Sequence, residues 1–336
     1  MKVLVCGGGN ICHAVAGMLS HYGHIVRVLT RNPTKWSNKL TVNYLGEVYC
    51  VLLDSVSSEP SDLLVDIDVV VITCPLSAVN PITALLEASG LLFPTIPIIG
   101  IPGRLYLPQI QDFKAKHNPL LLVSRTPYIC RAKKYGSNVE ITGICHGKIK
   151  FACLNGAEEG LIYMLFRLPC EEPVNNVKSI DLNNSNSLLH TCRLYDLFCT
   201  GITHKKQVLF YTEWTDLASQ LLIQCDNELQ NIINSLNKDE SIESQIYINP
   251  VLSHYQCQDA YSLTKKMCSI PAFTTITSPM YENTEDRVFL PDVTSRYFLE
   301  DVNYGLKYIL QEAKSNNVQT PTINMVYNAL LNLIQN

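Results

Sequence analysis

The first half of the chain alternates short apolar runs with longer segments in which apolar residues recur at helical spacing. Unbroken apolar runs are typical of strands buried on both faces of a parallel sheet. Periodic segments are typical of amphipathic helices that pack on such a sheet. The runs predict strands at residues 2–6, 25–29, 48–53, 68–73, 97–101 and 119–124, and the periodic segments predict helices at 10–22 and 77–89. The alternation therefore predicts an α/β domain of the Rossmann type with a doubly wound parallel sheet.

The stretch from Val139 to Leu154 has a different pattern. Two strand-like segments flank His146 and Gly147. Two strands joined by a short glycine-containing connection are typical of a β-hairpin. We therefore expect a hairpin added to the sheet.

A change of composition around residues 170–184 marks a domain boundary. Glu171, Glu172, Pro173 and a cluster of asparagines interrupt the apolar pattern there. Beyond it the apolar positions keep a helical period, and Thr320 before Pro321 is a good helix start. Helices are predicted at 187–198, 212–236, 255–267, 299–315 and 321–334. We therefore expect a Rossmann-type domain over 1–175 and a mostly α-helical domain over 180–336.

The first predicted strand ends in three consecutive glycines, and a helical pattern follows at once. This strand–turn–helix order is the context in which a glycine-rich loop binds the pyrophosphate of a dinucleotide. Gly7 permits the sharp turn, and Gly9 lets a phosphate approach the N–H groups of the helix N-terminus. Cys12 stands where the usual motif has Gly or Ala, and an ordinary tight turn is the alternative interpretation. The expected cofactor-binding residues of this loop are Gly7, Gly9, Asn10 and Ile11.

The end of the second predicted strand indicates which nicotinamide cofactor is preferred. A site that prefers NAD has Asp or Glu there to bind the ribose hydroxyls. This sequence has no acidic residue before Glu47. Instead Arg31 can form a bidentate pair with a 2′-phosphate, and Thr30 and Asn32 can donate to it. We therefore expect NADP(H) to be preferred over NAD(H), and a solvated arginine in a turn is the alternative.

A second part of the expected cofactor site follows the strand predicted at 68–73. Cys74 and Pro75 come directly after that strand. They would lie at the carboxyl edge of the parallel sheet, where ligands bind in folds of this type. We therefore include both residues in the cofactor site.

Composition narrows the function classes. The chain has 336 residues, of which 47% are hydrophobic and 17% charged, and its net charge of −4 gives no reason to expect nucleic acid or an anionic membrane as partner. Its thirteen cysteines include no pair with metal-type spacing, so we expect no metal site. The apolar stretch 63–79 contains Asp66, Asp68 and Pro75 and is too interrupted to span a membrane. A strand at the N-terminus leaves no room for a secretory signal, so we expect a cytoplasmic protein with reduced thiols. A homodimer is a possible assembly.

The helical half contains candidates for acid–base chemistry. Asn186 and His190 are four residues apart and share one face of a predicted helix near the domain boundary. An imidazole ordinarily titrates near neutrality and is suited to proton transfer. Arg296 and Asp301 flank the start of another predicted helix, where an arginine can bind a carboxylate in a fork. Taken alone, each is equally consistent with a packed histidine or a solvated ion pair.

Taken together, the chain resembles the octopine/nopaline dehydrogenase family over nearly its full length. The family's motifs occur here in order and with similar spacing: Gly7-Gly8-Gly9-Asn10-Ile11-Cys12-His13-Ala14, Asp68-Val69-Val70-Val71-Ile72-Thr73-Cys74-Pro75, Tyr128-Ile129-Cys130-Arg131, Asn186-Ser187-Leu188-Leu189-His190, Phe210-Tyr211-Thr212-Glu213-Trp214-Thr215, Ser295-Arg296-Tyr297-Phe298-Leu299-Glu300-Asp301-Val302 and Thr320-Pro321-Thr322-Ile323. Members of the family use NAD(P)H to join an α-keto acid to the amine of an amino acid. The product is a secondary-amine dicarboxylate called an opine.

The resemblance implies a role for each catalytic candidate. The family's catalytic His, Arg and Asp correspond to His190, Arg296 and Asp301, and Asn186 lies on the same helix face as the histidine. Arg296 would pair with the keto acid carboxylate. His190 would supply and collect protons at the imine, and Asp301 would hold the imidazole tautomer. Domain closure would exclude water from the imine.

Two other functions fit parts of the sequence. A ketopantoate-reductase-like enzyme shares the two-domain plan but uses no amine, and such enzymes typically use a helical lysine where this chain has His190. A catalytically inactive NADP-binding regulator would keep Gly7, Gly9 and Arg31 without the catalytic set. Arg104 and Arg131 are candidates to bind a second substrate carboxylate or to pair with structural acids.

Overall fold

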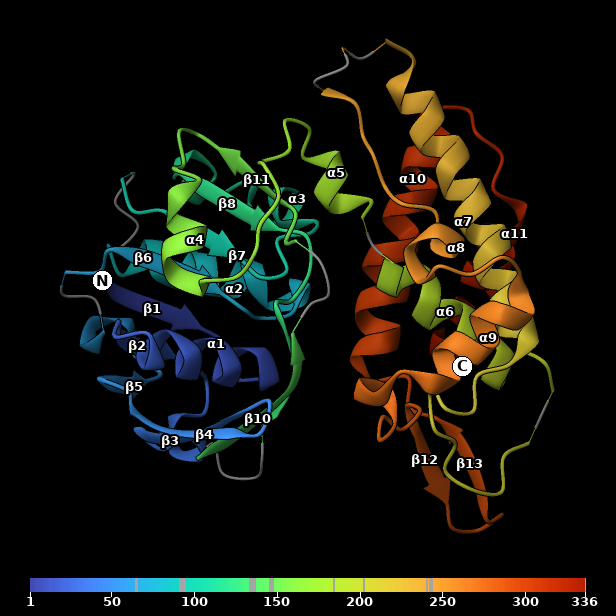
Figure 1. The fold of residues 1–336 in the computed structure, drawn as a ribbon, viewed down its shortest axis with the longest axis horizontal. Helices are drawn as coiled ribbons and strands as arrows, with labels where there is room; N and C mark the ends of the chain where they lie inside the picture. Colours follow the sequence, from blue (N-terminus) through green and yellow to red (C-terminus); the bar gives the residue numbers. More distant parts are fainter. Residues whose placement is uncertain are drawn as a thin grey trace. The chain divides into compact units, whose positions relative to one another are not determined.

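The computed structural model describes residues 1–63, 66–90, 95–132, 137–144, 148–183, 185–201, 203–239, 241 and 244–335. The chain divides into two compact units, Met1–Asp181 (unit 1) and Leu182–Asn336 (unit 2). Unit 1 contains two sheets with short helices, and unit 2 is mostly helical, as Figure 1 shows. The fold class expected from the sequence is thereby confirmed.

The larger sheet of unit 1 has seven strands in the order β11-β8-β7-β6-β1-β2-β5. All neighbours are parallel except β11, which pairs antiparallel with β8. The central strands are fully buried because they consist almost entirely of Val, Leu and Ile. The strand bounds are β1 (Lys2–Cys6), β2 (Ile25–Leu29), β5 (Ser55–Ser57), β6 (Val69–Ile72), β7 (Ile98–Gly100), β8 (Leu120–Val123) and β11 (Phe151–Leu154).

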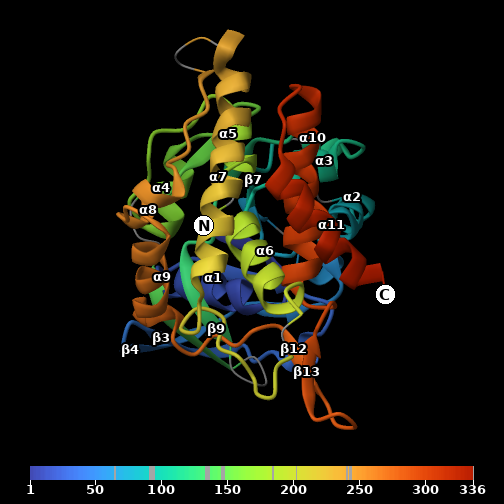
Figure 2. The same ribbon diagram turned by 90° about the vertical axis from the view of Figure 1, so that its right-hand side faces the viewer.

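Helices cover both faces of this sheet. Val3 and Val5 of β1 share one hydrophobic cluster with residues of α1 and α4. Leu4 between them points to the opposite face, since side chains alternate along a strand. That face is the side of α2 and α3 (Figure 2). The helix bounds are α1 (Asn10–His21), α2 (Leu76–Ala88), α3 (Tyr106–Ile110), α4 (Gly160–Phe166) and α5 (Lys178–Asp181).

A second sheet of four strands, in the order β4-β3-β10-β9, lies on the far side of α1 (Figure 1). The expectation that the run at 48–53 forms a strand of the large parallel sheet is wrong. That run is β4, which pairs antiparallel with β3 at the edge of the small sheet, and β5 takes its place beside β2. The bounds are β3 (Lys39–Tyr44), β4 (Glu47–Leu52), β9 (Tyr128–Ala132) and β10 (Asn138–Ile144).

The hairpin expected between Val139 and Leu154 is also wrong. β10 pairs with β9 and β3, whereas β11 pairs with β8 in the other sheet. The two strands are adjacent in sequence, but β10 pairs with the strand before it, β9, and with the distant β3, while β11 returns to β8. His146 and Gly147 lie outside the described residues.

Unit 2 is built around α6 (Ser185–Phe198), which packs against α7, α11 and η7. Apolar residues of these four helices form one continuous core. The other elements are α7 (Asp216–Leu236), α8 (Val251–Tyr255), α9 (Ala260–Ser269), the two-stranded sheet of β12 (Met280–Asn283) and β13 (Val288–Pro291), the π-helix η7 (Tyr297–Leu306), α10 (Lys307–Ser315) and α11 (Pro321–Gln335). No described helix is both long and apolar enough to cross a membrane.

Local capping chemistry explains where the predicted helices begin. α7 begins at Asp216 because the Thr215 hydroxyl accepts the Ala218 N–H at 3.1 Å. α9 begins at Ala260 because Asp259 and Ser262 form a reciprocal capping box. The helix predicted at 299–315 is π-helical over its first part, η7, before it continues as α10. Single-sequence periodicity does not separate these two kinds of helix.

Candidate active site

The glycine loop of unit 1 has room for a ligand at one position and none at its neighbours. Gly7 has a φ of +145°, and a Cβ there would lie 2.6 Å from the Thr73 hydroxyl oxygen. A Cβ on Gly8 would lie 2.7 Å from the hydroxyl oxygen of Thr30. A Cβ on Gly9 would meet no heavy atom within 4 Å. Gly7 and Gly8 are therefore required by the fold, and the space over Gly9 is open.

The N-terminus of α1 adjoins that open space. Gly9 is its N-cap, no side chain caps it, and no acidic residue lies in its first turn. Uncapped N–H groups with an uncompensated helix dipole favour an anion. Asn10 ties the loop to the second sheet, because its side-chain oxygen accepts the Ala132 N–H at 3.0 Å. Ile11, the next residue of the helix, is half-buried.

The expected 2′-phosphate site lies at the end of β2. Arg31 and Asn32 are exposed there. Thr30 is buried, its hydroxyl lies over Gly8, and its N–H donates to the Ser57 carbonyl at 3.0 Å. Arg31 is therefore the cation of this segment that is open to a ligand, while Thr30 shapes the loop.

Cys74 and Pro75 lie between β6 and α2. Cys74 is half-buried and Pro75 is exposed at the N-cap of α2. The preceding Thr73 joins β6 to β1, since its hydroxyl donates to the Cys6 carbonyl at 3.0 Å. These residues and Gly7 thus meet at the carboxyl edge of the large sheet, as parallel topology dictates.

In unit 2 the structure brings His190 and Asp301 together. Nδ1 of His190, on α6, lies 2.8 Å from Oδ2 of Asp301, on η7. The other carboxylate oxygen of Asp301 accepts the Ser187 hydroxyl at 3.1 Å. His190 and Asp301 are 5% and 6% exposed, so this ionisable pair is almost completely buried. The carboxylate selects the tautomer with hydrogen on Nδ1, which leaves Nε2 for proton exchange.

Nε2 of His190 has a partner of its own. It lies 3.0 Å from the hydroxyl of Tyr211. Burial raises the pKa of Tyr211 well above its usual value, and the nearby charge of Arg296 opposes this only in part. The phenol therefore stays protonated. The rings of Phe210 and Tyr297 stand edge-on to the imidazole, at 5.6 and 4.6 Å between centroids, and shield it from solvent.

Arg296 directly precedes η7, the helix that carries Asp301. Its side chain is exposed, and its guanidinium carbon lies 5.4 Å from the centre of the Tyr297 ring. An exposed guanidinium beside a buried His–Asp pair can bind an incoming carboxylate. Asn186 lies one turn before His190 on α6 and is exposed. We call His190, Asp301, Ser187 and Tyr211 the His190 cluster, and the described hydrogen bonds of this cluster do not include Asn186.

Arg193 holds the loop that carries Tyr211. It is 1% exposed and lies one turn after His190 on α6. Its Nε donates to the Phe210 carbonyl at 3.0 Å and its Nη2 to the Glu213 carbonyl at 2.6 Å. Asp196 balances its charge in an ion pair. Because His190 and Arg193 both lie on α6, the same helix positions the imidazole and the loop that carries Tyr211.

His190, Arg296 and Asp301 were expected in the site from the sequence, whereas Tyr211, Ser187 and Gly8 were not. Tyr211 and Ser187 stand in the motif segments that carry the family resemblance, which was the available indication. Their contact with the His190–Asp301 pair depends on tertiary packing. Of the two other arginine candidates, Arg104 is buried and Arg131 is exposed on β9.

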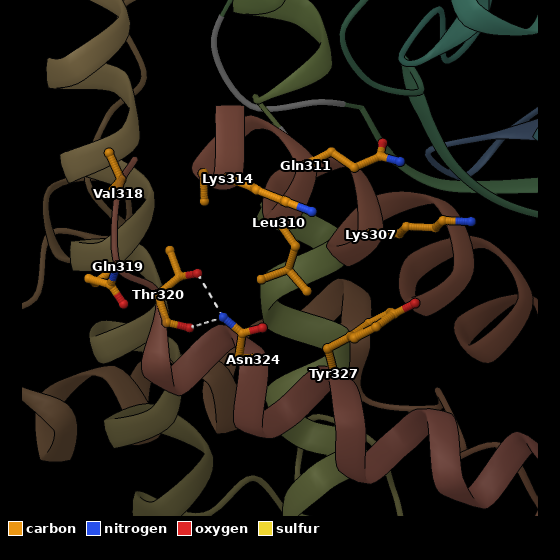
Figure 3. Close-up of a pocket in the computed structure, with 10 residues that line it drawn as sticks. Lys307, Leu310, Gln311, Lys314, Val318, Gln319, Thr320, Asn324 and Tyr327 are labelled. Atoms are coloured by element: carbon orange, nitrogen blue, oxygen red, sulfur yellow. Dashed lines mark hydrogen bonds between the residues drawn. The ribbon is translucent and has the colours of Figure 1, made fainter. Parts of the chain in front are cut away.

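A separate surface pocket of about 390 Å³ lies between α10 and α11 (Figure 3). Lys307, Gln311 and Lys314 line it from α10. On the α11 side, the Asn324 amide donates to the carbonyl and hydroxyl of Thr320 at 2.8 and 3.0 Å. None of the His190 cluster lines this pocket. Among the described residues, no group of three or more His, Cys, Asp or Glu side chains could hold a metal ion.

Comparison with known proteins gives consistent matches along the chain. Residues 173–333 match the family model described as NAD/NADP octopine/nopaline dehydrogenase, alpha-helical domain. The tauropine dehydrogenase of Arabella iricolor is 24% identical, over 96% of this chain and 88% of that protein. The opine dehydrogenase of Haliotis discus hannai is 25% identical, over 96% and 87%.

A solved structure has the same fold. Octopine dehydrogenase in complex with NADH and agmatine superposes with a TM-score of 0.83 at 21% identity, covering 100% of this chain and 90% of that one. The structural match covers both units, and the family model covers almost all of unit 2. Residues 173–333 therefore match the helical domain of the octopine/nopaline dehydrogenase family, and the whole chain is similar to opine and tauropine dehydrogenases in sequence and to octopine dehydrogenase in fold.

Proposed function

We propose that this chain is an NADPH-dependent opine dehydrogenase that condenses an α-keto acid reductively with the amine of an amino acid. The observation that carries the proposal is the buried His190–Asp301 pair beside the exposed guanidinium of Arg296. A proton-exchanging imidazole next to a carboxylate-binding cation is what reduction of a keto acid imine requires. The family-model match of residues 173–333 and the similarity to opine and tauropine dehydrogenases support the same reaction class.

The residues of unit 1 fit a nicotinamide dinucleotide with a 2′-phosphate. The open space over Gly9 and the uncapped N-terminus of α1 suit a pyrophosphate. The exposed Arg31, with no acidic residue before Glu47, suits NADPH better than NADH. When bound, the cofactor supplies the hydride that reduces the imine carbon. Because the octopine dehydrogenase structure holds NADH, the preference has to be measured on this chain.

Each catalytic side chain then has one task. Arg296 binds the carboxylate of the keto acid and orients its carbonyl carbon. His190 exchanges protons with the reacting oxygen and nitrogen while the amine adds and water leaves. Asp301 fixes the imidazole with its proton on Nδ1 and stabilises the charged ring. The aromatic side chains around His190 exclude water, which would otherwise hydrolyse the imine.

An NADPH-oxidation assay tests the reaction class. The purified chain is incubated with pyruvate or another α-keto acid, with and without pooled amino acids, and the products are identified by mass spectrometry. We expect turnover that depends on the amine and a product whose mass equals a reduced imine. NADH in place of NADPH gives the cofactor preference in the same experiment.

Two other outcomes would replace the proposal. Turnover without an amine, with a 2-hydroxy acid as product, would indicate a ketopantoate-reductase-like enzyme. NADPH binding without turnover on any substrate pool would indicate a non-catalytic NADP-binding regulator.

A further inference from the structure

The Tyr211 hydroxyl lies within hydrogen-bond distance of Nε2, the ring nitrogen through which His190 would act. The Asp301 carboxylate accepts hydrogen from Nδ1, so Nε2 is the nitrogen that gains or loses a proton. The Tyr211 hydroxyl, 3.0 Å from Nε2, can donate to the neutral ring and accept from the charged one. The contact therefore persists in both states of the imidazole. A substrate that exchanges protons with His190 must displace this hydroxyl or act through it.

The surroundings of Tyr211 favour the second alternative. Its ring is 5% exposed and stacks on Phe273 at 4.2 Å and parallel to Trp214 at 6.2 Å between centroids. Arg193 holds the backbone on both sides of it through the Phe210 and Glu213 carbonyls. Displacing the hydroxyl would disturb all of these contacts. A side chain fixed in this way is preorganised.

The hydroxyl also has the right electrostatic neighbour. The guanidinium carbon of Arg296 lies 5.4 Å from the centre of the Tyr297 ring, and that ring lies 4.6 Å from the imidazole of His190, so a carboxylate bound by Arg296 would enter beside the His190–Tyr211 contact. Because burial raises the pKa of Tyr211 well above its usual value, the phenol does not ionise on its own. It can pass on a proton only when it receives another at the same time. These are the properties of a relay.

We propose that Tyr211 relays the proton between Nε2 of His190 and the reacting oxygen or nitrogen of the substrate. This inference rests on the proposed function. In the reductive direction the Nε2–H bond breaks as that proton bonds to the phenolic oxygen. The phenolic O–H bond breaks as its proton bonds to the substrate oxygen that leaves as water, or to the imine nitrogen. Tyr211 is neutral before and after, and His190 is left neutral, to be protonated again after the product has left.

The variant Tyr211→Phe tests the relay, because it keeps the stacked ring and removes only the hydroxyl. We expect kcat to fall by about ten- to hundredfold, with the KM for the keto acid nearly unchanged. The pH profile of kcat should lose or shift the limb due to His190. Tyr195→Phe is the matched control, since Tyr195 is a half-buried tyrosine on α6 outside the His190 cluster. It should behave as wild type.

A second measurement does not depend on turnover. ¹⁵N NMR of the histidine rings, with His190 assigned by comparison with His190→Ala, follows protonation of Nε2 across pH. The titration curve of His190 should differ between wild type and Tyr211→Phe and be unchanged in Tyr195→Phe. An identical titration curve in Tyr211→Phe overturns the proposal. Amine-dependent turnover of Tyr211→Phe at the wild-type rate also overturns it. Absence of any amine-dependent turnover in the wild type overturns the proposed function first, and the relay with it.

Discussion

Nδ1 of His190 lies 2.8 Å from Oδ2 of Asp301, although the two residues are 111 positions apart in the chain. Both side chains are buried, so neither can replace the other's hydrogen bond with bulk water. Removing one partner of such a pair leaves a buried polar group unsatisfied. A substitution at either residue should therefore lower local stability as well as the proposed activity, and experiments on this pair have to separate the two effects.

His190→Ala should lower the maximal rate of reductive turnover by about 10²–10⁴-fold while NADPH still binds. Asp301→Asn should show part of this loss, because its amide no longer stabilises a charged imidazole. Rates are to be expressed per folded molecule, as judged by NADPH titration and circular dichroism. Wild-type turnover in the folded fraction of His190→Ala would make His190 a packing residue.

Arg296→Ala should act mainly on the KM for the keto acid. The carboxylate is held equally in the ground state and the transition state, so its loss changes binding more than kcat. Arg296→Lys should recover part of the affinity, because a lysine keeps the charge but loses the fork. Steady-state kinetics over a wide keto acid range separate the two constants. A lowered kcat at unchanged KM would contradict the carboxylate role.

Gly9→Val should impair NADPH binding, whereas Gly8→Val should lower the stability of the fold. A valine at Gly9 enters open space, so the protein should fold with wild-type thermal stability but lose NADPH binding. A valine at Gly8 meets the buried Thr30 hydroxyl and should cost about 1–3 kcal/mol of stability. Calorimetry of unfolding and fluorescence titration with NADPH measure the two effects. Undiminished NADPH affinity in Gly9→Val would show that the loop is only a turn.

Arg31→Ala should weaken NADPH far more than NADH. A charge-assisted bond to the 2′-phosphate contributes about 1.5–3 kcal/mol, which is roughly ten- to hundredfold in affinity. Lys35→Ala, an exposed cation four residues further on, is the matched control for general loss of positive charge. Equal losses for both cofactors, or a wild type that prefers NADH, would count against the assignment.

Unit 1 should lose stability on acidification because of His13. This ring is 4% exposed, lies over Trp36 at 3.6 Å between centroids, and its Nδ1 is 2.9 Å from the Gly9 carbonyl oxygen. Burial lowers the pKa of His13 in the folded protein. The unfolded chain therefore takes up the proton first, below about pH 6.5. The contribution of His13 to the free energy of unfolding should be constant above that pH, fall as the pH drops from about 6.5 toward the lowered pKa of the folded state, and level off below it.

Denaturant titrations at pH 8, 6 and 5 check this, with the fluorescence of Trp36 as reporter for unit 1. His13→Gln removes the titrating group, so the stability difference between wild type and variant should shrink toward acid pH. A difference that stays constant across the three pH values would show that His13 does not carry the effect. His24, whose pKa is also lowered by burial, is present in both proteins and cancels in the comparison.

Local patterns in the sequence were sufficient to predict the class of fold and most of the helices and strands. The apolar runs at β1, β2, β6 and β8 are strands in the large sheet, and the glycine turn leads into α1 as expected. Such features depend on neighbouring residues alone, since strand alternation, helical period and glycine geometry act over a few positions. The family motifs also pointed to His190, Arg296 and Asp301.

Tertiary structure alone decided which distant segments meet. An apolar run such as β4 has the same local character in either sheet, and long-range pairing with β3 determined where it lies. Likewise, Tyr211 has no sequence relation to His190 that predicts a hydrogen bond. The two meet because α6, η7 and the loop held by Arg193 pack into one core. The free energy of these contacts comes from burial and hydrogen bonding between residues far apart in the chain, which no local pattern records.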